Sequence, residues 1–395
     1  MANEAPFELS ELFFSRTDLG GRILSGNSVF QRVSQYSEIE LTHQPHNIIR
    51  HHDMPKAVFR LLWDTIKRGE PIGAYVKNKA KDGCFYWVFA IVTPVENGYL
   101  SVRLKPTSTL LTTIQQEYKS LLEYERQPGV TPSESAKVLL SRLNELGFDD
   151  YQSFMACALY EEISARESGL RLQPDQSINE LSSLLESSKI LMAKSGVISH
   201  SYAENQYVPL NLSVKAAQLG QVAATIGVIS TNYSVLSDEI RLRMSEFMDS
   251  AQGVYKTVCQ GLFLACTAKM QSEMLEFFKG ENCFGETSEE QENSLLTKQK
   301  DAYQTKAVKG LTEIAKQAQT FYKSCSEMKR LAAGLGVTRV MGKIETSFLQ
   351  TADASLDDLM DNLMHFQNSI ELNLKEIEGI NRHIEKQIAI LLRIL

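Results

Sequence analysis

Apolar residues along the chain follow two different periodicities, and the change between them falls near residue 130. Up to about Pro106, apolar runs are short and are separated by turn residues such as Gly20-Gly21, Asp82-Gly83 and Asn97-Gly98. This punctuation is typical of strands joined by hairpins. Beyond residue 130, turn residues become scarce and helix-forming residues dominate, which indicates an all-α region.

The first part of the pattern predicts a small sheet with a helix inserted between its strands. The run Phe85 to Thr93 is rich in β-branched and aromatic residues, as expected of a buried strand. Pro55 to Lys67 instead carries apolar residues at helical spacing. The other expected strands are Arg22 to Leu24, Ala74 to Asn78 and Tyr99 to Leu104.

The second part predicts long helices with identifiable starts. Thr131-Pro132-Ser133-Glu134 places a proline in the first turn and an acidic residue close behind, which marks a helix start. Pro174-Asp175 marks another. Longer helical patterns run over about Val222 to Lys279, Thr287 to Ala333 and Leu356 to Leu395, with an interruption at Gly280 to Gly285.

The last of these patterns carries an apolar stripe at three- and four-residue steps. Its members are Leu356, Leu359, Leu363, Phe366, Ile370, Leu374, Ile377 and Ile380/Ile384. Such a stripe buries against partner helices. An intramolecular bundle seam and a dimeric coiled coil predict the same stripe, so both interpretations stay open.

Composition narrows the class of protein. The chain has 395 residues, 43% of them hydrophobic and 23% charged, which indicates a packed protein of at least two domains. A net charge of -7 with no cluster of Lys and Arg argues against nucleic acid as a partner. No window is apolar enough for a transmembrane segment, no secretory leader is evident, and the six cysteines form no CxxC pair. We therefore expect a cytoplasmic protein.

Motifs for catalysis and metal binding are missing from the sequence. It has no GxSxG elbow, no HExxH and no kinase-like signature, so we expect no enzyme. Four histidines fall between His43 and His52 but lack partners at ligand spacing, so we expect no metal site.

One segment carries a specific resemblance. Phe14 to Asp18, Gly21 to Ile23 and Asn27 to Phe30 are followed by the run PHNIIRHHDMP at residues 45–55, and then by Trp63 and by Tyr86-Trp87-Val88. In order and spacing these pieces resemble the PAS domains of bacterial aerotaxis receptors. The resemblance covers about residues 13 to 105, and the family has a proline where His52 stands.

That resemblance implies a fold and a cofactor. It implies an α+β class, with a PAS domain of a five-stranded antiparallel sheet and helices ahead of a long helical bundle or coiled-coil region. It also implies noncovalent FAD, with haem or no ligand as the alternatives. The positions that it assigns to the flavin are Asn27, Arg50, His51, Asp53 and Trp63. A structural ion pair between Arg50 and Asp53 would accompany an empty PAS core.

The helical region carries a fainter resemblance to a chemoreceptor hairpin tip. The residues are LNLSVKAAQLGQ at 210–221, followed by Val228 to Ser230 and Leu236 to Ile240. Here Lys215 and Gln218 replace charged residues of the family pattern. The resemblance implies either kinase contact or an ordinary αα-hairpin, and both remain open.

These observations predict four segments and one function. The segments are a PAS sensor domain at 13–107, a linker at 108–130, a helical region at 131–285 and a C-terminal helical region at 286–395. We expect a cytoplasmic redox, oxygen or energy sensor that relays its state through the helices to protein partners, as a homodimer. The alternative is a scaffold protein with a ligand-free PAS dimerisation domain.

Overall fold

The computed structural model describes residues 3–219, 224–280, 283–285, 288–348 and 354–394. The chain divides into two compact units, one of residues 1–179 with 259–309 and the other of residues 180–258 with 310–395. This division differs from the expected boundaries, because α9 (Ala224–Phe278) and α10 (Glu289–Phe348) each contribute residues to both units.

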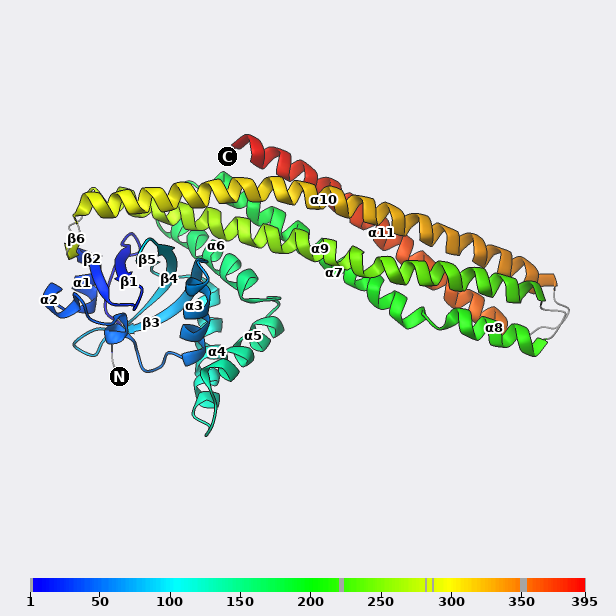
Figure 1. Ribbon diagram of the computed structural model, residues 1–395, viewed down its shortest axis with the longest axis horizontal. Coiled ribbons are helices and arrows are strands. Elements are labelled where there is room, and N and C mark those ends of the chain that lie inside the picture. Colours follow the sequence, from blue (N-terminus) through cyan, green and yellow to red (C-terminus); the bar gives the residue numbers. More distant parts are fainter. Residues whose placement is uncertain (1–2, 220–223, 281–282, 286–287, 349–353, 395) are drawn as a thin grey trace. The chain divides into compact units, whose positions relative to one another are not determined.

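The first unit is built on an antiparallel sheet (Figure 1), whose strands appear in the order β3-β4-β5-β1-β2-β6. The expected strands are confirmed and are longer than expected. They are β2 (Ile23–Asn27), β3 (Ile72–Lys79), β4 (Phe85–Val95) and β5 (Gly98–Leu104). Strand β1 (Phe13–Asp18) completes the five that the resemblance implies. Asn97 adopts a φ of 64° in the tight β4–β5 turn. The next residue must be glycine, since a Cβ on Gly98 would lie 1.9 Å from the Thr17 carbonyl oxygen.

A sixth strand from outside the N-terminal region joins the five expected strands. Strand β6 (Cys283–Gly285) comes from the connection between α9 and α10 and pairs with β2. Phe284 packs over the β2 residue Gly26, where a Cβ would come within 2.7 Å of its ring. A strand of three residues has too little pattern to be recognised in a sequence.

Short helices complete this unit. The expected helix at 55–67 is confirmed as α3. In chain order, these helices are α1 (Ser28–Ser34), α2 (Glu38–Leu41), the 3-10 helix η1 (His46–Ile49), α3 (Lys56–Lys67), α4 (Thr109–Glu125), α5 (Pro132–Glu145) and α6 (Tyr151–Gly169). Helix α5 begins where expected, because Thr131 and Glu134 form a reciprocal capping box. Helix α4 occupies most of the expected linker and buries Ile114, Tyr118 and Leu121.

The two faces of the sheet are covered by different helices. Along β1, Ser15 and Thr17 point to the face beneath α3, where a cavity lies. Their neighbour Phe14 packs edge-on against Phe278 of α9 on the opposite face, with ring centroids 4.9 Å apart. Side chains alternate between the faces of a strand, so β1 contacts the cavity and the long helices through adjacent residues.

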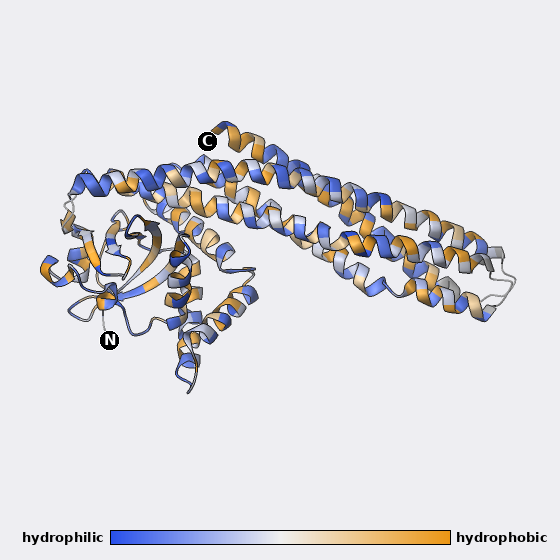
Figure 2. Cartoon of the chain, viewed as in Figure 1, coloured by the Kyte–Doolittle hydropathy of each residue, from blue (hydrophilic) through white to orange (hydrophobic). Residues whose placement is uncertain are grey.

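The second unit is helical. It contains α7 (Gln176–Asn205), α8 (Val208–Leu219) and α11 (Ala354–Ile394), with parts of α9 and α10. Polar and apolar residues alternate along these helices (Figure 2), as expected of helices that bury one face. Helices α8 and α9 pack as an αα-hairpin through Ser230 Oγ, which donates to the Pro209 carbonyl at 2.6 Å. The expected helix ends at Val222, Thr287 and Leu395 lie outside the described residues.

Helix α10 is longer than expected, ending at Phe348 instead of Ala333. Gly334 and Gly336 stand just beyond the expected end, and both lie inside α10. A Cβ on Gly336 would lie 2.0 Å from Gln367 Nε2 of α11, and a Cβ on Gly342 would lie 2.8 Å from Met360. Here glycine permits a close approach of two helices, which outweighs its low helix propensity.

The apolar stripe of α11 packs within the chain. Six of its members are buried, namely Leu363, Phe366, Ile370, Leu374, Ile377 and Ile384. Phe366 contacts Tyr202 of α7 with ring centroids 6.2 Å apart. The Cys325 thiol of α10 donates to the Leu374 carbonyl oxygen at 3.9 Å. The stripe is therefore an intramolecular seam. The side chain of Leu356 lies outside the described residues. Within the described part of the chain, no helix is long and apolar enough to cross a membrane.

Glu162 of α6 joins three elements of the first unit and is fully buried. Its carboxylate accepts hydrogen bonds from Tyr75 Oη at 2.7 Å and from the backbone N–H groups of Thr107 and Ser108 at 2.6 and 3.0 Å. Ser108 Oγ also donates to it at 2.6 Å. Because Ser108 precedes α4, the carboxylate satisfies N–H groups at the start of that helix.

Removing this carboxylate should destabilise the first unit selectively. Glu162→Ala leaves buried donors without acceptors, so we expect the free energy of unfolding to fall by about 2–4 kcal/mol. The chain has two tryptophans, Trp63 and Trp87, both in this unit. Urea denaturation followed by tryptophan fluorescence therefore measures the effect, with the exposed Glu161→Ala as the control. Equal midpoints for the two variants would contradict this role.

Candidate functional site

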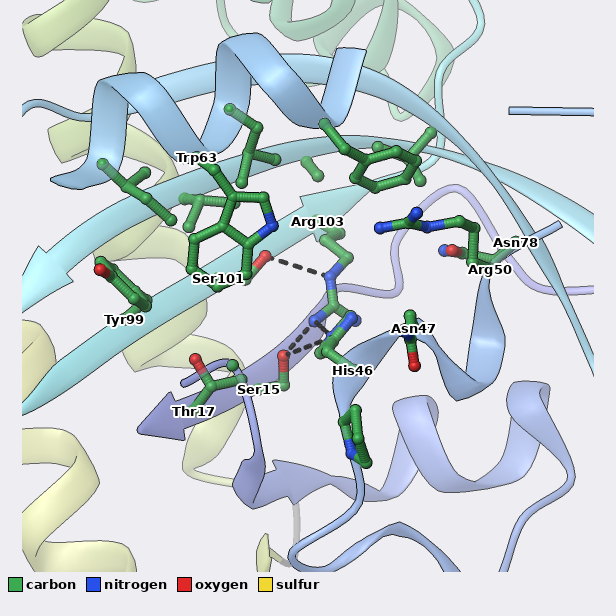
Figure 3. A pocket seen from close by; sticks show the side chains of 18 of the residues that line it. Ser15, Thr17, His46, Asn47, Arg50, Trp63, Asn78, Tyr99, Ser101 and Arg103 are labelled. Carbon is green, nitrogen blue, oxygen red and sulfur yellow. Dashed lines mark hydrogen bonds between the residues drawn. The ribbon is translucent and has the colours of Figure 1, made fainter. Parts of the chain in front are cut away.

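A cavity of about 190 Å³ lies between α3 and the sheet (Figure 3). One water molecule needs about 10–15 Å³ of such space, so the cavity has room for a ring-shaped ligand. Its apolar wall consists of Phe59, Leu62, Trp63, Ile66, Val76, Val88, Ala90 and Val92. Its polar lining consists of Ser15, Thr17, His46, Asn47, Arg50, Asn78, Tyr99, Ser101 and Arg103.

The indole of Trp63 forms one end of the apolar wall, and the turn after β1 determines its position. Gly21 has a φ of +79°, and a Cβ at this position would lie 2.9 Å from Trp63 Cη2. Only glycine suits both the left-handed conformation and the close indole. Tyr99 meets the indole edge-on, with ring centroids 5.7 Å apart.

Arg103 of β5 is the most unusual lining residue, because its long cationic side chain is only 2% exposed. Its Nε donates to Ser101 Oγ at 3.1 Å, and its Nη2 contacts Ser15 Oγ and His46 Nε2, the latter at 2.8 Å. Its Nη1 is buried and has no hydrogen-bond partner. Burial lowers the pKa of Arg103 to about 10, so the guanidinium remains charged at neutral pH.

His46 is the neutral partner of this guanidinium. Burial of the ring and the positive charge of Arg103 lower the pKa of His46 to about 3. Its Nε2 faces a group that can only donate, so this nitrogen is the acceptor and the ring proton resides on Nδ1. The imidazole also stacks on Phe30, with ring centroids 5.8 Å apart.

Arg50 supplies a second positive charge to the lining. Its guanidinium lies over the ring of Phe59, 3.5 Å from the centroid. Its Nε is buried and lacks a hydrogen-bond partner. No acidic residue lines the cavity, and among the described residues no carboxylate forms an ion pair with Arg50 or Arg103. The cavity therefore carries positive charge without a counterion from its own lining.

The structure brings only two of the five expected site residues, Arg50 and Trp63, into the cavity lining. Asn27 is buried, and its side chain serves the backbone. Its amide oxygen accepts from the N–H groups of Phe14 and Phe30, and its amide nitrogen donates to the Leu12 carbonyl. Asn27 is thus the N-cap residue of α1 and connects this helix to β1 by hydrogen bonds.

His51 and Asp53 shape the loop beside the cavity. Asp53 forms an ion pair with Lys77 Nζ at 2.7 Å. The pair between Arg50 and Asp53, which was expected for an empty core, is therefore not formed. His51 Nδ1 accepts from the Asp53 N–H at 3.1 Å. Burial and Lys77 lower the pKa of His51 to about 4. Together with His52 these side chains place three ligand atoms close enough to surround a cation. His51 Nδ1 already accepts the Asp53 N–H, and Asp53 Oδ2 is already paired with Lys77.

Comparison with known proteins agrees with this architecture. Residues 23–102 match the family model of the PAS fold. The chain is 40% identical over 138 residues to the aerotaxis receptor of Escherichia coli (strain K12), covering 34% of this chain and 26% of the receptor. It is 29% identical over 90 residues to the nitrogen fixation regulatory protein of Klebsiella pneumoniae, covering 23% of this chain and 18% of that protein. Residues 23–102 form a PAS domain.

The chain spans about a quarter or less of the length of these curated relatives. Among solved structures, a PAS domain from Colwellia psychrerythraea is similar at 21% identity, covering 24% of this chain and 86% of that one. The TM-score of this match is 0.21.

Several cavity residues of the PAS domain were missed in the sequence. The strand pattern contained a signal for some of them, because Tyr99, Ser101 and Arg103 alternate with apolar Leu100 and Val102. Alternation places those three side chains on one face, but it does not tell whether that face borders a cavity. His46 lies in the run PHNIIRHHDMP at residues 45–55. Its contact with Arg103 could not be predicted, because it forms only when the fold brings this run next to β5.

The depressed pKa of His46 predicts an acid-sensitive PAS domain. The unfolded chain binds a proton at His46 near its ordinary pKa of 6.5, whereas the folded domain does so only near 3. Stability should therefore fall as pH decreases below 6.5, by at most about 1.4 kcal/mol per pH unit from this group. Urea denaturation between pH 7 and 5 should show a smaller loss for His46→Gln than for the wild type. The exposed His43→Gln should behave like the wild type, and an unchanged slope in His46→Gln would contradict the assignment.

Proposed function

We propose that this protein is a sensor, not an enzyme, in which the PAS cavity binds FAD and reports its redox state through the helices. The observation that supports a ligand is the cavity itself, where buried Arg103 and Arg50 both keep unpaired nitrogen atoms. Buried polar groups are normally satisfied. The flavin as ligand comes from the resemblance to aerotaxis receptors, with which the chain shares 40% identity over the matched residues.

The lining residues fit the parts of a flavin nucleotide. The ring would lie in the apolar part of the cavity beside Trp63, whose flat indole suits an aromatic ligand. Arg50 is the candidate for the diphosphate, because a guanidinium binds phosphate oxygens in a bidentate manner. Asn27, His51 and Asp53 would act indirectly, by holding α1 and the loop that carries Arg50. When bound, the flavin supplies reversible electron uptake.

Haem is the second candidate, and the contacts of His46 argue against it. An axial imidazole needs a nitrogen with an available lone pair. His46 is the histidine in the cavity lining, and its Nε2 already accepts from Arg103 at 2.8 Å. A ligand-free scaffold is the third possibility, and it would leave both arginines uncompensated.

We infer that the signal leaves the PAS domain through β1. Arg103 contacts Ser15, and the next residue, Arg16, binds Glu292 of α10 on the opposite face, with Nε and Oε1 2.9 Å apart. The same oxygen accepts from Ser25 Oγ of β2 at 2.7 Å. Glu292 therefore holds a cross-strand pair of the sheet, because Arg16 and Ser25 are register partners. A charge change in the cavity would shift β1, and β1 would in turn shift the first turn of α10. The helix that follows Pro106, α4, would be a second element to receive the change.

Loss of Arg50 should release the cofactor. The purified protein is expected to show flavin absorbance, and Arg50→Ala should bind FAD at least tenfold more weakly without loss of helicity. Absorbance of the gel-filtered protein and circular dichroism measure these two properties. Arg60→Ala is the matched control, since Arg60 is an exposed α3 residue paired with Asp64. A fully loaded Arg50→Ala protein would refute the pocket assignment, and a colourless wild type would favour the scaffold.

Breaking the Glu292 contact should uncouple α10 from the cavity. In the wild type, reduction of bound FAD should change the hydrogen exchange of residues 289–300. In Glu292→Gln the loss of the ion pair with Arg16 should abolish most of this change while the flavin remains bound. Exposed Glu290→Gln serves as the control. An equal response in both variants would rule out this route.

A further inference from the structure

The environment of Arg103 specifies more than an occupied cavity. A guanidinium has five N–H donors, and the partners of this one are two hydroxyl groups and a neutral imidazole. The ring of Phe30 adds a cation–π contact at 5.0 Å. None of these groups carries a negative charge, although burying an uncompensated ion costs several kcal/mol.

The other titratable groups around Arg103 do not supply the missing charge. Tyr86 is buried with an unpartnered hydroxyl, and burial raises its pKa, so it stays neutral. His46 is neutral above about pH 3. Arg50 adds a second positive charge. A negative charge near Arg103 would have to come from the ligand.

We propose that Arg103 receives the negative charge that the flavin ring acquires on reduction. This inference rests on the proposed function. Oxidised flavin is neutral, and two electrons with one proton convert it into an anion whose charge lies at N1 and the adjacent carbonyl. A second proton from water would give the neutral form. The Arg103 guanidinium favours the anion, so the second proton stays in the solvent.

This assignment gives reduction a mechanical consequence. In the structure, Arg103 is shared among Ser15, Ser101 and His46. A full negative charge competes for the same donors, because charge-assisted hydrogen bonds are about twice as strong as neutral ones. Arg103 would then turn toward the ring and loosen its contact with Ser15 of β1. Charge at the ring thereby reaches the strand that contacts α10.

The test is the pH at which the reduced ring ionises. The full-length protein is loaded with FAD and reduced with dithionite, a two-electron donor, and its absorbance is recorded from pH 5 to 9. In the wild type the ionisation should lie at least one pH unit below that of free reduced FAD, which is a tenfold change in the ionisation constant. Arg103→Met should raise it by at least one unit, and Arg103→Lys should restore most of the shift.

Each outcome is decisive. A loaded wild type that ionises at the pH of free reduced FAD overturns the inference without any variant, which matters because Arg103→Met removes a buried side chain and could impair folding. A loaded Arg103→Met protein with the wild-type ionisation also overturns it. Both results leave the proposed function intact. A protein that takes up no FAD overturns the proposed function and this inference together.

Discussion

The positive charge of Arg103, buried on the cavity side of the sheet, is the constraint on which the account depends. Folding leaves this guanidinium 2% exposed and places no carboxylate in the cavity lining to neutralise it. The neighbouring residues adapt to the charge. His46 is held neutral as an acceptor, and Ser15 and Ser101 supply hydroxyl groups. Under the proposed function, a ligand that supplies the missing acceptor would also change the contacts that hold the sheet.

The alternation of side chains along β1 connects the cavity on one face of the sheet to α10 on the other face. Ser15 lies in the cavity, and Arg16 contacts Glu292 on the other face. Strand β6, which lies between α9 and α10 in the chain, adds a second contact with the sheet because it pairs with β2. Strands β1 and β2 thus contact the start of α10 and the segment before it directly.

Local pattern predicted the elements well, and tertiary contacts determined what it missed. The strands around Phe89 and Tyr99 and the start of α5 at Thr131 follow from β-branched runs, turn residues and capping. By contrast, α10 was expected to end near Ala333, because the close helix approach that Gly336 permits appears only when Gln367 is packed against it. The site shows the same limit. Asp53 lies near Arg50 in the chain but pairs with Lys77 across the fold, and Arg103 meets His46 only after the sheet has formed.

A crystal structure of the purified full-length protein tests the central claim most directly. The account predicts an ordered ligand in the cavity between Trp63 and Arg103, with an oxygen or nitrogen acceptor within hydrogen-bond distance of Arg103 Nη1. A closed cavity in which a protein carboxylate or ordered water satisfies that nitrogen would contradict it.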